Sequence, residues 1–390
     1  MDVDDRLTMR SSFSVGSALP KWAEWHPSTP YTVGVEEEVM LIDPADSSLA
    51  HRIDDVLPRL SQHLAAHVTA ETHGSAIELA SFAHSTSKGT ALEAARLRVS
   101  LADELGQLGL GAAAAGTHPF AVWTDTRISS GARYQLIYGS MRELARREPT
   151  FAVHVHIGVS EPEAAIELYN RLRAHAPLLL ALSANSPFWQ GRDTGLASAR
   201  TPLFQAFPRV GIPRPFASYA DYVETIDLLL RCEAFPEPTF LWWDIRPQPS
   251  LGTVELRIMD AQSTVAETGA LAALVQAIAR LELEEGYASE QLIGAQELLE
   301  ENRFLAMRDG MGAELLDPVH QRRMPAGVLL SELLEAARDH ARDLGSEDAL
   351  EALADAAHET GADRQRRIAG AGQDLPGLVA SLVDAFPQQA

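Results

Sequence analysis

The chain has 390 residues, and acidic residues outnumber basic ones by 54 to 32, which gives a formal net charge of −22. A surface of this charge repels nucleic acid and anionic lipid, so neither is expected as a partner. Cys232 is the only cysteine, which excludes an intramolecular disulfide and a thiolate zinc site. No apolar run is long enough to cross a bilayer and the N-terminus is unlike a secretory signal, so we expect a cytoplasmic protein.

The chain divides into three regions by composition and periodicity. Residues 1–30 show no clear period and are expected to form a loose leader. Apolar residues at helical spacing predict helices over 90–108, 161–184, 219–232, 265–285, 328–343 and 347–359. Predicted strands and helices do not alternate regularly, which favours an α+β fold. The two regions that follow are a mixed one over 31–285 and a helical C-terminal region over 286–390.

Four short segments, 32–41, 76–80, 151–159 and 253–259, alternate between apolar and polar side chains, as strands with one buried face do. Their polar faces carry four carboxylates, two imidazoles and one guanidinium: Glu36, Glu38, Glu78, His154, His156, Glu255 and Arg257. A merely solvated sheet face usually carries Lys, Ser, Thr and Gln as well, so this composition favours a functional site. Glu37 is the exception, because the alternation places it with the apolar side chains.

Carboxylate and imidazole ligands on a rigid sheet suit Mg²⁺ or Mn²⁺ held between carboxylates and phosphates. A fixed guanidinium beside them suits a phosphate or a developing oxyanion. The pair His154 and His156 also admits a zinc site, and with it a metal-dependent hydrolase. The surplus of glutamates favours magnesium. A non-catalytic protein that only binds a ligand is the third alternative.

Six motifs occur together in one order: GVEEEVMLID (34–43), AGTHPFAVW (115–123), HVHIGV (154–159), LSANSPFWQGRDTGLASART (182–201), LWWDIRP (241–247) and TVELRIMD (253–260). As a set they resemble the bacterial type-2 glutamate–cysteine ligase family of carboxylate–amine ligases. The resemblance implies the fold of the glutamine synthetase superfamily. In that fold a curved, mostly antiparallel sheet forms a funnel-shaped active site, with helices packed outside it. Residues 31–285 are then expected to form the catalytic domain, and residues 286–390 to pack on the convex side of its sheet.

The resemblance also implies roles for individual residues. The expected metal ligands are Glu36, Glu38, Glu78, His154 and Glu255. His156 is expected to contact a phosphate of ATP and Arg257 to face the γ-phosphoryl group, so that these two and Glu255 form the catalytic set. The expected contacts of the acid substrate are Asn185 and Arg200, with Asp244 and Arg246 as further candidates.

The reaction implied by the resemblance is ATP-dependent amide formation through an acyl phosphate, with Mg²⁺ or Mn²⁺ as the cofactor. Glutamate and cysteine are the first expected substrates, and other amines remain open. The expected partners are therefore a small-molecule acid and amine, and a homodimer is the default assembly.

Overall fold

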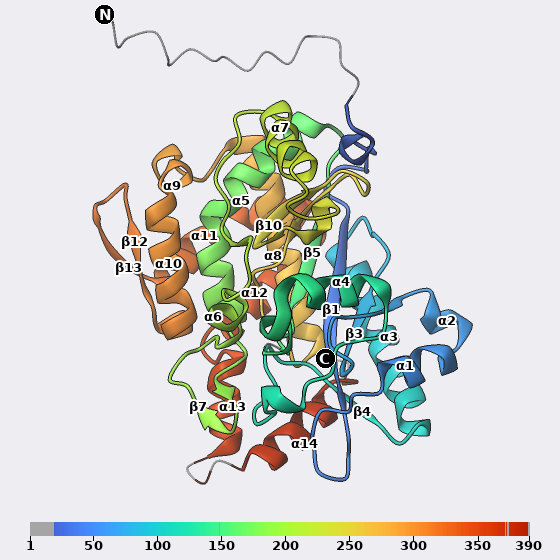
Figure 1. Ribbon diagram of the computed structural model, residues 1–390. Coiled ribbons are helices and arrows are strands. Elements are labelled where there is room, and N and C mark those ends of the chain that lie inside the picture. The colour runs from blue at the N-terminus through green and yellow to red at the C-terminus, as the bar shows by residue number, and fades with distance from the viewer. Residues whose placement is uncertain (1–18, 148, 371, 373, 389–390) are drawn as a thin grey trace, which may run out of the picture.

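The computed structural model describes residues 19–147, 149–370, 372 and 374–388 (Figure 1). Within those residues the largest sheet has seven strands in the order β10–β11–β5–β1–β3–β2, with β4 also paired to β1. The pairings in this sheet are antiparallel. Its strands are β1 (Val33–Ile42), β2 (Val68–Ala70), β3 (Ala76–Ala80), β4 (Gly111–Ala113), β5 (Val153–Gly158), β10 (Ile245–Gln248) and β11 (Thr253–Leu256).

The helices predicted from periodicity are present, and their ends differ from the predicted ones by a few residues at most. The longer helices are α3 (Ser87–Gln107), α4 (Ala132–Met141), α5 (Pro162–Ser183), α7 (Tyr219–Arg231), α8 (Val265–Glu285), α10 (Gln296–Asp309), α11 (Ala326–Asp343), α12 (Glu347–Ala356), α13 (Gly361–Ala369) and α14 (Leu375–Ala385). The short helices are α1 (Ile53–Val56), α2 (Gln62–Ala65), α6 (Arg200–Phe204) and α9 (Glu290–Gly294). Two-residue strands are β6 (Phe188–Trp189), β7 (Arg192–Asp193), β8 (Val210–Gly211) and β9 (Trp242–Trp243), and β12 (Glu314–Asp317) pairs with β13 (Arg322–Pro325).

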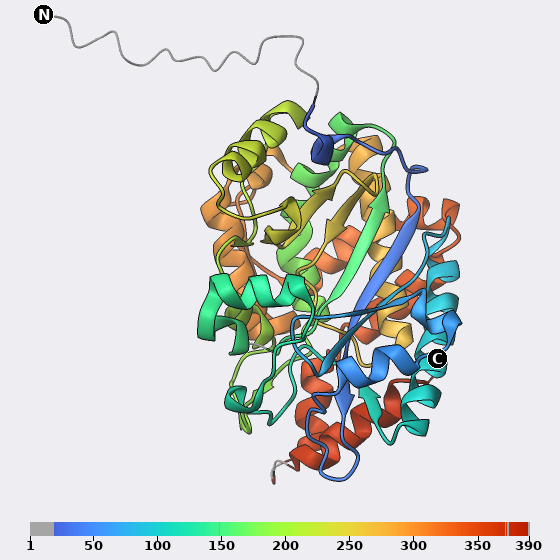
Figure 2. The same cartoon turned by 45° about the vertical axis from the view of Figure 1, so that its right-hand side comes forward.

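One face of the sheet is covered by α3, α5 and α8, and the opposite face carries the polar side chains (Figures 1 and 2). The apolar members of the alternation, including Val35 and Val155, are buried on the helix side. Helix α8 begins at a capping box formed by Thr264 and Glu267 and ends at Gly286, which adopts the left-handed conformation. This arrangement of an antiparallel sheet with helices outside it confirms the predicted α+β fold class.

The C-terminal helices form a second layer. Helices α11 and α12 pack on α8, and α10 packs on α5, so most of this region covers helices and not strands. Helix α14 is the exception, since it packs against β4. The expected packing on the convex side of the sheet is therefore mostly indirect.

The described part of the expected leader is packed and not loose. Trp22 and Trp25 lie edge-on against Tyr222 and Tyr219 of α7, with ring centroids 6.1 and 5.8 Å apart. The Tyr219 hydroxyl donates a hydrogen bond to the Ala23 carbonyl at 2.7 Å. Residues 1–18 lie outside the described part of the chain. No described helix combines the length and apolar character needed to span a bilayer.

Candidate active site

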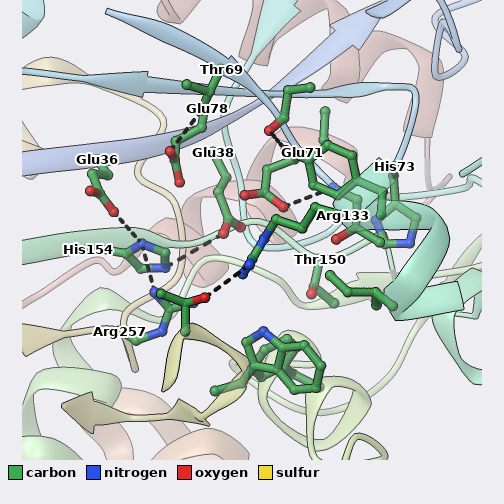
Figure 3. A pocket seen from close by; sticks show the side chains of 18 of the residues that line it. Glu36, Glu38, Thr69, Glu71, His73, Glu78, Arg133, Thr150, His154 and Arg257 are labelled. Carbon is green, nitrogen blue, oxygen red and sulfur yellow. Dashed lines mark hydrogen bonds and ion pairs between the residues drawn. The ribbon is translucent and has the colours of Figure 1, made fainter. Parts of the chain in front are cut away.

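The register of the sheet brings the predicted polar residues together on one face. Directly opposed residues in antiparallel strands share a face, and the pairs across neighbouring strands are Glu36 with His154, Glu38 with Glu78, and Glu255 with both His156 and Arg246. Figure 3 shows Glu36, Glu38, Glu78, His154 and Arg257 directed toward one another. The alternation seen in the sequence therefore becomes one wall of a pocket.

The pocket is a cavity of about 440 Å³. Its wall includes Glu36, Glu38, Glu78, His154, His156, Arg200, Arg246 and Arg257 from the sequence prediction. It also includes residues that the prediction missed, among them Thr69, Glu71, Arg133, Tyr134, Glu237, Thr239 and Trp242. Eight of the eleven predicted site residues thus line one cavity. Glu255 is not part of the cavity wall, but it forms ion pairs with Arg246 and Arg257, which are.

His154 is the centre of the carboxylate cluster. Its Nδ1 lies 3.1 Å from Glu36 Oε2, and its Nε2 lies 3.6 Å from Glu38 Oε1. His156 approaches the same Glu36, with Nε2 3.3 Å from Oε1, and its Nδ1 lies 3.0 Å from the Thr253 hydroxyl. One ligand atom each from Glu36, His154 and Glu255 lie within 4.8 Å of one another, which is close enough for a shared cation.

The charges of this cluster fit a divalent cation. Burial raises the pKa of Glu38 to about 7 and raises the pKa of Glu71 and Glu78, and neighbouring carboxylates add to each shift. Among the described residues, the buried Nε2 atoms of His154 and His156 have no hydrogen-bond partner. Acidic oxygens that repel one another and imidazole nitrogens without a partner are the donor set that Mg²⁺ or Mn²⁺ would satisfy.

Glu255 is a fully buried carboxylate shared by two arginines. Arg246 Nε donates to its Oε2 at 2.7 Å, Gln248 Nε2 donates to the same oxygen at 2.6 Å, and Arg257 Nη1 donates to Oε1. These partners lower the pKa of Glu255 well below its ordinary value, against the effect of burial. Glu255 is near enough to contribute to a metal site, and its hydrogen bonds also fit a role in orienting Arg257.

Arg200 lines the pocket, but most of its hydrogen bonds go to backbone carbonyls of the protein. Its Nη1 and Nη2 donate to the carbonyls of Ile258 and Arg257, both at 3.0 Å, and its Nη1 lies 3.9 Å from the buried Asp260 carboxylate. The buried Nε has no hydrogen-bond partner within the described ranges. Arg200 therefore positions the backbone of Arg257 and keeps one free donor.

Two predicted substrate contacts lie outside the pocket wall. Asn185 is fully buried, and its Nδ2 donates to the Ala261 carbonyl at 2.8 Å and to Ser263 Oγ at 3.1 Å. Asp244 is buried in an ion pair with Arg303 at 2.6 Å. Their side chains are committed to internal bonds, so this geometry gives no support for direct substrate contact by either residue.

Glu37 lies on the opposite side of β1, as the alternation predicted. Arg98 on α3 is fully buried there and donates from Nε to Glu37 Oε2 at 2.9 Å and from Nη2 to Oε1 at 2.5 Å. Thr268 on α8 donates a third hydrogen bond to this carboxylate at 2.6 Å. The Arg98–Glu37 ion pair therefore attaches β1 to the helix layer at the position between Glu36 and Glu38. No local pattern marks Arg98 as the partner of Glu37, because only packing brings α3 to that position.

Comparisons with known proteins agree with this fold. A family model described as glutamate-cysteine ligase family 2 matches residues 32–385. The chain is 38% identical to a putative glutamate–cysteine ligase 2-1 of Rubrobacter xylanophilus over 355 residues, which cover 91% of this chain and 94% of that protein.

Two solved structures share the fold at 12% identity. One is a glutamate–cysteine ligase of Francisella tularensis in complex with AMP, with a TM-score of 0.66 over 94% of this chain and 90% of that one. The other is a bifunctional glutathione synthetase of Pasteurella multocida, with a TM-score of 0.70 over 91% of this chain and 52% of that one. Together with the family match and the identity to a relative of similar length, these findings show that the chain belongs to glutamate–cysteine ligase family 2 and is an enzyme of the carboxylate–amine ligase class.

Proposed function

We propose that the protein uses ATP to activate a glutamate-like acid as an acyl phosphate and transfers the acyl group to an amine. Glutamate and cysteine, which would give γ-glutamylcysteine, are the leading substrate pair because they are named in the family description and in the name of the Rubrobacter relative. The observation that carries the proposal is the convergence of three paired-strand carboxylates, two imidazoles and Arg257 on one cavity wall: Glu36, Glu38, Glu78, His154, His156 and Arg257.

The chemistry explains why such a wall is needed. A carboxylate oxygen attacks the γ-phosphorus of ATP, a C–O–P bond forms, and the bond to ADP breaks. The amine nitrogen then attacks the acyl carbon, phosphate leaves, and one proton leaves the nitrogen. Two anions must approach each other in the first step, so the site has to neutralise both.

The residues that would hold Mg²⁺ or Mn²⁺ are Glu36, Glu38, Glu78, His154 and Glu255. A divalent cation bound there supplies charge neutralisation at the phosphate oxygens. The fixed register of these residues makes the ligand geometry rigid, because each sits on a paired strand. His156, held through Nδ1 by Thr253, presents Nε2 toward the same space and is placed to contact a phosphate.

Arg257 would stabilise the negative charge on the transferred phosphoryl group. Glu255 and the backbone bonds from Arg200 hold it in place. Its buried Nε has no hydrogen-bond partner in the described part of the chain, which leaves a donor for an anion. A cation fixed before the reaction costs no reorganisation when charge develops.

The test is a phosphate-release assay with ATP, Mg²⁺, glutamate and a panel of amines, followed by mass measurement of the product. Release of ADP and phosphate that requires both acid and amine, with an amide product, supports the proposal. Glu36→Gln should remove this activity and also weaken Mn²⁺ binding measured by titration, whereas Arg214→Ala, which breaks a surface ion pair with Asp221, should change neither. Hydrolysis without nucleotide would support a hydrolase instead, and binding without turnover would support a non-catalytic protein.

A further inference from the structure

The pocket has a cationic residue that differs from its other arginines. Arg200, Arg246 and Arg257 are each paired with Glu255 or Asp260, carboxylates that are fully buried. Arg133 pairs instead with Glu237, whose side chain is 48% exposed, and its own side chain is 39% exposed. Of the arginines that line the cavity in the described chain, Arg133 is thus the one whose counterion can be exchanged at little cost, because exposed ion pairs contribute little free energy.

Arg133 is nevertheless held in a defined position. Its Nη1 donates to Thr239 Oγ1 at 2.9 Å, and its guanidinium carbon lies 4.8 Å from the centre of the Phe240 ring. The next residue, Tyr134, donates its hydroxyl to the Ala70 carbonyl at the end of strand β2. Helix α4 therefore reaches from the β2 edge of the sheet to the segment that precedes β10, and Figure 3 shows Arg133 extended into the cavity.

The carboxylates of the cavity make a cationic contact favourable for an anionic ligand. Glu36, Glu38, Glu71 and Glu78 all face the same space. A substrate that carries a carboxylate which does not react would be repelled by them unless a cation received it. A guanidinium is suited to that task, since it can bind a carboxylate through two parallel hydrogen bonds.

We propose that Arg133 binds a non-reacting carboxylate of a substrate, and that Glu237 holds this arginine in place until the substrate exchanges with it. The inference rests on the proposed ligase function and extends it to the substrate class. At least one of the two substrates is then an amino acid or a dicarboxylic acid whose second carboxylate is recognised. That carboxylate could belong to the acid or to the amine, because the chemistry of recognition is the same.

Two pairs of probes separate these sources. Glutamate is compared with 4-aminobutyrate, which lacks the α-carboxylate, and cysteine is compared with 2-aminoethanethiol, which lacks its carboxylate. Wild type is measured beside Arg133→Met, Arg133→Lys and Glu237→Gln. Arg338→Met, which removes an arginine from a surface ion pair with Glu335, is the matched control.

We expect Arg133→Met to raise the KM of the recognised substrate about 10- to 100-fold, the effect of losing a hydrogen bond to a charged group. The KM of its decarboxylated analogue should stay within about twofold, because the analogue never used the arginine. Arg133→Lys should restore part of the loss, and Glu237→Gln should lower that KM or leave it unchanged. An analogue that binds without turnover has no KM. For such a probe, calorimetric titration measures the Kd, and the same difference between substrate and decarboxylated analogue is expected.

Equal losses for both members of each pair would show that Arg133 is only structural, and no loss for any probe would show that it does not bind substrate. Either result overturns the inference while wild-type turnover still supports a ligase. Absence of acid- and amine-dependent phosphate release from wild type would instead refute the proposed function itself.

Discussion

Removing Arg98 should destabilise the protein more than any single change on its surface. Arg98 and Glu37 are 0% and 2% exposed, so Arg98→Met leaves a carboxylate buried without its cation. Breaking a buried pair by removing one partner costs about 3–5 kcal/mol. Arg98 also donates to the carbonyls of Gln262 at 2.9 Å and Ser263 at 3.1 Å, so its loss strips two further buried acceptors of a donor.

This magnitude is large against the whole stability of a domain, which is typically about 5–15 kcal/mol. The double variant Glu37→Leu with Arg98→Met removes both charges together. It should recover a substantial part of the loss, because well-packed apolar replacements of a buried pair are often close to neutral. The contrast between the single and double variants therefore separates the penalty of an unpaired charge from the loss of packing.

Urea denaturation followed by tryptophan fluorescence measures these free energies. Arg338→Met is the surface control and should stay within about 0.5 kcal/mol of wild type. A loss below about 1 kcal/mol for Arg98→Met would refute the argument, because it would mean that the buried charge finds another partner. A double variant less stable than Arg98→Met alone would refute it as well.

Three further outcomes are expected. Arg257→Ala should lower kcat by about 10²–10³ while circular dichroism shows a folded chain, and near-normal turnover by the folded variant would contradict its role. A chain truncated after Glu285 should be insoluble in a sedimentation assay, because α8 then exposes the apolar face on which α11 and α12 pack. Burial lowers the pKa of His118 to about 4, and its Nδ1 accepts hydrogen bonds from two backbone N–H groups. The unfolded chain therefore binds this proton first, so stability should fall as pH drops from about 6.5 to about 4, by at most about 3 kcal/mol, and His118→Gln should flatten that dependence in urea titrations.

The part of the site that lies on long alternating strands could be predicted from the sequence. Period-two alternation determines the face of each side chain, and it predicts that Glu36, Glu38, His154 and Glu255 lie on the polar faces of their strands. The strand pairings confirm that these faces form one side of the sheet. The same rule placed Glu37 on the opposite face, where the structure has its partner Arg98. The local pattern was sufficient to predict a site residue wherever the strand backbone alone determines the direction of its side chain.

The remaining site depends on tertiary contacts that leave no local pattern. Strand β2 has three residues, too few to reveal an alternation, so Glu71 beyond its end was missed. Arg133 lies in the first turn of α4, and only tertiary packing brings that helix to the pocket. The resemblance implied that Asn185 contacts the substrate, but Gln365, far along the chain, donates to its side chain at 2.7 Å.

The contact between Arg98 and the last described turn has a consequence for synthesis. Arg98 Nη1 donates to the Phe386 carbonyl at 3.4 Å, and its guanidinium lies over the Phe386 ring. During synthesis, residue 386 must therefore leave the ribosome before Arg98 can make all of its contacts beside β1. Until then the first acidic strand lacks its complete packing, so the site can finish folding only after nearly the whole chain has been synthesised.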